Sequence, residues 1–263
     1  MSVGIFQRLI EHIRDTGPRR LRAAGIHFSL SALVFVVALY LILAHWFPGF
    51  HFVVDGGWQG TRLVAAVDLV LGPTLTLLIF NPLKARRLIV FDLACIGMAQ
   101  LAALGWGFYA IHSQRPVSVN FYDGTFSSIT AAPIEAEKYP LSILDALSDR
   151  KPALIYVAPP ANVDEQTRAA MMEMVGGAPE YADPLRFKKF LPNWDTVRAR
   201  AKPLTVPDKE RPEFALARAE FLAKRGGAVA DYLYFPFSGR YGECTLAFSQ
   251  QGELLEALDC RAF

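Results

Sequence analysis

The chain has 263 residues, of which 52% are hydrophobic, and its mean hydropathy is +0.24. The apolar excess lies before residue 113, and it excludes an ordinary soluble protein. The net charge is +2, but residues 113–263 hold 18 Lys and Arg against 20 Asp and Glu. Because that part has no basic face or Arg-rich tract, we expect no nucleic-acid partner.

Three apolar runs, over residues 28–47, 63–80 and 88–111, are long enough to cross a lipid bilayer. About 20 residues at a rise of ~1.5 Å per residue span a hydrocarbon core of roughly 30 Å. A buried helix of a soluble protein could explain one such run, but three in close succession favour membrane spans. We therefore predict a three-helix transmembrane bundle over residues 27–112.

The charges of the short loops predict the orientation of these spans. Residues 1–26 carry five arginines and residues 82–87 carry one Lys and two Arg, whereas residues 48–61 carry neither. Loops rich in Lys and Arg stay in the cytoplasm. We therefore expect a multi-pass protein of the bacterial inner membrane, with a cytoplasmic tail over residues 1–26 and a periplasmic domain over residues 113–263. The first span is too long for a cleavable signal peptide, so it should remain as an anchor.

The periplasmic part has the pattern of a mixed domain of helices and strands. Asp123-Gly124 stands between two strand-like segments, which is a strong hairpin signal. Strands are expected over residues 117–122, 125–130, 153–157 and 232–237, with a final hairpin around residue 251, and helices over residues 163–175, 194–201 and 211–225. This order predicts an α+β domain with antiparallel strands.

Two cysteines of the periplasmic part are expected to form a disulfide. Cys244 and Cys260 are an even pair in an oxidising compartment, and they lie on the two arms of the final hairpin. A two-residue turn would set Cys244 opposite Asp259, so the bond needs a bulge or a longer loop.

The sequence carries no recognisable catalytic motif. It has no Cys-x-x-Cys, no His-Glu-x-x-His, no Gly-x-Ser-x-Gly and no phosphate-binding glycine loop. Residues 113–263 contain no histidine, the commonest general base and metal ligand. We therefore expect no enzymatic activity, no cofactor and no metal site.

The second span holds the least expected residues of the apolar region. Asp68 is a carboxylate inside a membrane span, which is costly and often functional. Tyr40, His45 and Trp106 are its possible partners; a structural hydrogen bond, a partner's helix and a polar cavity are the three explanations. Pro73 cannot donate to the carbonyl of residue 69, so a kink is expected there, with Thr74 and Thr76 compensating.

The third span adds a second carboxylate and a row of small side chains. Asp92 lies near the start of that helix, where the helix dipole and the arginines of the preceding loop favour it. Small residues recur at Cys95, Ala99, Ala103 and Gly107. Such a row lets another helix approach closely. We expect it to pack against the first two spans, with a groove for a foreign helix as the alternative.

Four stretches of the chain carry a resemblance to a known family: residues 68–80 with Asp68, Gly72 and Pro73, then Phe91-Asp-Leu-Ala94, Ala99-Gln-Leu-Ala102 and Arg115-Pro-Val117. Together they resemble the type IV pilin accessory protein family of the TfpX/TfpZ type. The resemblance covers residues 27–122. It implies an inner-membrane protein that helps to assemble type IV pili by binding a major pilin or the assembly machinery, without catalysis. The matching positions Asp68, Gly72, Pro73 and Asp92 become the functional candidates. A membrane enzyme or a sensor that uses Asp68 in a polar cavity is the alternative.

Overall fold

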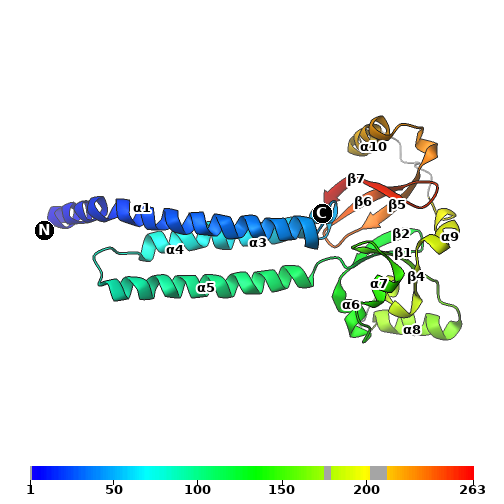
Figure 1. Ribbon diagram of the computed structural model, residues 1–263, viewed down its shortest axis with the longest axis horizontal. Helices are drawn as coiled ribbons and strands as arrows, with labels where there is room; N and C mark the ends of the chain where they lie inside the picture. Colours follow the sequence, from blue (N-terminus) through cyan, green and yellow to red (C-terminus); the bar gives the residue numbers. More distant parts are fainter. Residues whose placement is uncertain (1, 175–178, 202–211) are drawn as a thin grey trace. The chain divides into compact units, whose positions relative to one another are not determined.

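The computed structural model describes the whole chain except residues 1, 175–178 and 202–211 (Figure 1). It divides into two compact units. The first consists of Met1–His45 and Trp58–His112, and the second of Trp46–Gly57 and Ser113–Phe263. We call them the helical unit and the sheet unit.

The helical unit contains three helical segments that are long and apolar enough to cross a membrane, Thr16–Trp46, Gly57–Ile79 and Arg86–Ser113. They cover the three predicted spans. The first is formed by α1 (Ser2–Leu41) and η1 (Ile42–Trp46), the second by α3 (Gly57–Ala65), η2 (Ala66–Leu71) and α4 (Gly72–Ile79), and the third by α5 (Arg86–Ser113).

The backbone of the second segment is irregular in front of Pro73. There η2 is a π-helical turn, in which the N–H of Gly72 donates to the carbonyl of Val67, five residues earlier. A proline lacks the N–H of a regular helix and its ring presses on the preceding turn, and a π-turn relieves both problems locally. The irregularity predicted at Pro73 therefore takes the form of a widened turn that contains Asp68.

Helix α1 packs along η2 and α4. Helix α5 comes close to the second segment where Ile111 lies against Gly60 and where Gln100 lies against Gly72. Side chains from all three segments leave a cavity between them.

The sheet unit is built on one seven-stranded sheet with the order β4-β3-β1-β2-β5-β6-β7. The strands are β1 (Ser118–Tyr122), β2 (Thr125–Ile129), β3 (Ala153–Val157), β4 (Phe187–Lys189), β5 (Leu233–Ser238), β6 (Gly242–Phe248) and β7 (Leu254–Ala262). The expectation of antiparallel strands is only partly correct, because β1 pairs with β3 in parallel and β2 pairs with β5 in parallel. Long helical connections separate these pairs in sequence, and parallel pairing requires such crossovers.

The three helices predicted for the sheet unit are present, and the described residues add short helices and 3₁₀ turns that were not foreseen. Together they are α6 (Ala131–Ala136), α7 (Ile143–Leu147), α8 (Val163–Met174), α9 (Trp194–Arg198) and α10 (Pro212–Arg225), with η3 (Glu180–Ala182), η4 (Pro184–Arg186), η5 (Leu191–Asn193) and η6 (Val229–Asp231). Residues 175 and 211, at the ends of two expected helices, lie outside the described residues. Helix α7 packs on β3 and α10 on β7.

Both predicted hairpins are present. Asp123 and Gly124 turn between β1 and β2 with positive φ values of 44° and 84°, as a tight hairpin turn requires. Cys244 and Cys260 form a disulfide across β6 and β7. A register shift beside Cys244, with Asp259 at a positive φ of 50°, supplies the bulge that this pairing needs.

The connection between the first two spans belongs to the sheet unit. Helix α2 (His51–Val54) packs on β6 and β7, and Val54 is fully buried among the aromatic side chains of the sheet. Its carbonyl accepts a hydrogen bond from the N–H of Tyr241 over 2.7 Å. The domain boundary expected at residue 113 therefore leaves out a segment that completes the core of this unit.

Candidate functional site

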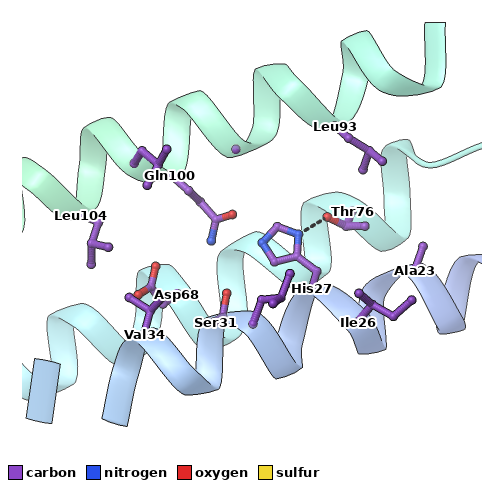
Figure 2. A pocket seen from close by; sticks show the side chains of 13 residues that line it. Ala23, Ile26, His27, Ser31, Val34, Asp68, Thr76, Leu93, Gln100 and Leu104 are labelled. Carbon is purple, nitrogen blue, oxygen red and sulfur yellow. Dashed lines mark hydrogen bonds between the residues drawn. The ribbon is translucent and has the colours of Figure 1, made fainter. Parts of the chain in front are cut away.

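A cavity of about 510 Å³ lies inside the helical unit, between α1, η2, α4 and α5 (Figure 2). We call it the membrane cavity. Most of its lining is apolar, but five polar side chains contribute to it: His27, Ser31, Asp68, Thr76 and Gln100. A ligand pocket of this kind, with a mainly apolar wall and a few placed polar groups, is typical of binding sites.

Asp68 is the most unusual group of the cavity. The π-turn η2 holds it, and only 3% of its surface is exposed. Within the described part of the chain its Oδ2 has no hydrogen-bond partner. A buried oxygen without a partner costs free energy, so the arrangement favours a group that can donate to it.

A second polar contact joins α1 and α4, about two helical turns after Asp68 along the second segment. The His27 Nδ1 and the Thr76 Oγ1 are 2.6 Å apart, and Figure 2 shows this bond across α1 and α4. Thr76 was expected to compensate the backbone near Pro73, but its hydroxyl faces His27. These two side chains are partners of each other, whereas Asp68 presents an open acceptor.

Gly72 sets the position of Gln100. A Cβ at residue 72 would overlap the flexible side-chain amide of Gln100, so the amide lies against the helix here because residue 72 has no side chain. Gln100 then reaches from α5 toward the wall that carries Asp68 (Figure 2). The glycine that was singled out in the sequence thus shapes the cavity, one turn from the carboxylate.

The partners expected for Asp68 do not line the membrane cavity. Tyr40 makes an edge-on contact with His45, and Trp106 packs against Tyr109. Tyr40 is 62% exposed and Trp106 is 72% exposed on the outside of the helices. The polar groups that share the cavity with Asp68 come instead from His27 and Ser31 on α1 and from Gln100 on α5.

Asp92 lies outside the cavity. Its Oδ2 is 2.5 Å from the Nζ of Lys84, in the loop before α5. Arginines of this loop are expected near Asp92, but its ion-pair partner is Lys84. This ion pair gives Asp92 a partner within the helical unit, and its functional role stays a prediction.

The row of small residues faces outward for most of its length. Cys95, Ala99 and Ala103 are exposed in the helical unit, and only Gly107 is buried. Their exposure does not favour packing against the first two spans, and the alternative, a face that receives a foreign helix, stays a prediction. The face of α5 that looks into the cavity is instead formed by Leu93, Gly97, Gln100, Leu101 and Leu104.

Sequence reasoning missed His27, Ser31 and Gln100 as members of the site, although a signal was present. Residues four apart lie on one face of a helix. His27 and Ser31 are spaced in this way on the first span, and Asp68, Gly72 and Thr76 on the second. Polar residues at this spacing, on two neighbouring spans, would have indicated a shared polar wall.

The sheet unit holds a buried network of charges. Arg186, 5% exposed, lies 3.4 Å from Asp183 and donates to the carbonyl of Glu180 over 2.5 Å. Tyr122 donates to the Glu180 carboxylate, and burial together with that carboxylate raises the pKa of Tyr122. The network ties the segment before β4 to β1. No group of three or more His, Cys, Asp or Glu side chains that could hold a metal ion is found in the described ranges.

Known proteins place the chain in a family. It is 34% identical over 100 residues to the fimbrial assembly protein of serogroups C1 and C2 from Dichelobacter nodosus. These 100 residues are 38% of this chain and 76% of that relative. The chain belongs to the fimbrial assembly protein family. Fimbrial assembly proteins of serogroups E1 and I from the same organism match with the same identity over 100 residues, but those residues span only 39% of each relative's length. No protein-family model matches this fimbrial assembly protein, and no solved structure does.

Proposed function

We propose that this fimbrial assembly protein is an inner-membrane accessory protein of the TfpX/TfpZ type, which assists type IV pilus assembly by binding the major pilin rather than by catalysis. The family assignment supports a role in assembly. Three apolar helical segments and a separate sheet unit give it one part suited to a membrane-embedded partner and one suited to a globular partner.

The proposed topology rests on the charges of the loops. The N-terminus and the loop that contains Lys84 are cytoplasmic, and Ser113–Phe263 is periplasmic. The disulfide between Cys244 and Cys260 supports an oxidising compartment for the sheet unit. Alkaline phosphatase fused after residue 263 should be active, and the same enzyme fused within residues 82–87 should be inactive.

The observation that carries the binding role is the membrane cavity, which presents an open acceptor on Asp68 inside a mainly apolar wall. A deletion strain tests the proposal. Loss of the protein should reduce surface pili while pilin accumulates in the inner membrane, and an affinity-tagged copy should co-purify with the major pilin from detergent extracts. Normal piliation in the deletion strain would overturn the proposed function.

The same cavity favours one competing function, a membrane enzyme or a sensor in which Asp68 handles a proton. Replacement of Asp68 by Asn keeps the size of the side chain and removes its ability to exchange a proton. If Asp68→Asn abolishes pilus assembly while pilin still co-purifies in full, the chemistry of the carboxylate is essential and the competing function gains support.

A further inference from the structure

We infer that the membrane cavity is the docking site for one apolar helix of the partner, and that Asp68 accepts a hydrogen bond from a donor group on that helix. The inference rests on the proposed function, because it names the place where the pilin would bind.

The first step concerns the chemistry of the donor. Asp68 is buried, and its Oδ2 has no partner among the described residues. Among the described residues, neither Lys nor Arg lines the cavity, and the Nδ1 of His27 is 2.6 Å from the Thr76 hydroxyl. A hydroxyl, an amide or an ammonium group that entered the cavity would satisfy this oxygen, and an ammonium group would also balance its charge.

The second step concerns the kind of molecule that brings the donor. Acyl chains could fill the apolar part of the cavity, but they carry no hydrogen-bond donor at that depth. A polypeptide inside the hydrocarbon layer must satisfy its own backbone, and a single segment does so as a helix. A membrane helix is therefore the occupant that meets both the apolar wall and the carboxylate.

The third step concerns size. One turn of a helix 10–12 Å in diameter, with a pitch of 5.4 Å, occupies roughly 420–610 Å³. The cavity measures about 510 Å³. The two volumes agree in order of magnitude, which suits one helical element rather than a larger domain. Helix α5 lies close to the second segment at Gly60 and Gly72.

Cysteine cross-linking tests this docking site in the full-length protein. In a Cys95→Ser background, Leu104→Cys puts a thiol on the cavity face of α5, and Met98→Cys puts a matched thiol on its exposed outer face. The probe is a co-expressed, epitope-tagged major pilin with single cysteines along its membrane helix. Cross-links to the pilin are expected from residue 104 and not from residue 98.

Asp68→Asn should lower the yield of the residue-104 cross-link at least about tenfold, because it removes the charge from a charge-assisted hydrogen bond. Asp92→Asn, at the ion pair outside the cavity, should leave the yield unchanged, and immunoblots must show equal amounts of each variant in the membrane. Equal cross-linking from residues 98 and 104, or an unchanged yield in Asp68→Asn, would overturn the inference.

The two proposals fail in different ways. If pilin co-purifies with the wild-type protein but no cavity cysteine reaches it, the accessory role stands and the docking site is wrong. If pilin neither co-purifies nor depends on the protein for assembly, the proposed function itself is wrong.

Discussion

Replacement of Asp55 by alanine should destabilise the sheet unit more than any change at its surface. Asp55 follows α2, and 3% of its surface is exposed. Its Oδ2 is 2.5 Å from the Nδ1 of His51, and its Oδ1 accepts from the Ser128 hydroxyl and, over 3.2 Å, from the N–H of Arg240. One carboxylate therefore holds the connection between the first two spans to β2 and to the loop before β6.

The magnitude follows from what alanine leaves behind. Removal of one partner from a buried, hydrogen-bonded charge cluster costs about 3–5 kcal/mol, because the remaining donors stay buried without an acceptor. For a domain of this size, each kcal/mol lowers the melting temperature by roughly 2–4 °C. The expected fall is therefore roughly 6–20 °C. Asp55→Asn keeps one acceptor oxygen and should show a smaller fall.

The assay is protease resistance of the full-length protein in detergent after brief heating, with the sheet unit detected through a C-terminal tag. Glu243→Ala is the matched control, because it also removes a carboxylate, but from the exposed ion pair with Arg261. Exposed pairs contribute about 0–1 kcal/mol. If Asp55→Ala shifts the transition no further than Glu243→Ala, the connection does not stabilise the sheet unit and the reasoning is refuted.

Three further predictions follow from other contacts. The pKa of Tyr122 is raised in the folded protein, so its contribution to stability is present below about pH 10 and is lost as the pH rises through the raised pKa. Tyr122→Phe should therefore reduce the loss of stability at alkaline pH in the same proteolysis assay. Joint replacement of Cys244 and Cys260 by alanine opens a bridge between residues 16 apart and should cost about 3 kcal/mol, and reductant should then have no further effect. Gly72→Ala should push the flexible end of Gln100 away from its place and lower pilus output at normal protein levels, and Gly72→Ala combined with Gln100→Ala should lower it no further than Gln100→Ala alone.

The sequence allowed the helices and hairpins to be predicted because their signals are local. Apolar runs fix the three long segments, and Asp123-Gly124 fixes the first hairpin through the backbone conformations that these residues adopt. The pairing of distant strands has no such signal. The parallel contacts of β1 with β3 and of β2 with β5 depend on crossovers whose direction is decided by packing.

The candidate site could be predicted only in part, for a similar reason. Asp68 and Gly72 stand out in any apolar segment, because a charge and a flexible residue are unusual there. Which groups face Asp68 depends on the rotation of α1 and α5 about their axes. Tyr40 and Trp106 are expected near Asp68, but they lie 13 and 6 residues along their helices from His27 and Gln100, the groups that line the cavity.

Two features were not predicted from the sequence: the connection that contains Asp55 belongs to the sheet unit, and polar side chains of the helical unit share a cavity with Asp68. The connection that contains Asp55 ends at Gly57, where α3 begins, and Asp68 lies in η2, the next helical element of the same span. A single continuous segment, residues 46–79, therefore includes both a part of the sheet unit and the polar wall of the cavity. The effect of a substitution in the sheet unit can therefore be measured at the cavity. If Asp55→Ala lowers cross-linking at residue 104 while Glu243→Ala does not, the sheet unit and the cavity are coupled. If both leave it unchanged, each unit binds its part of the partner independently.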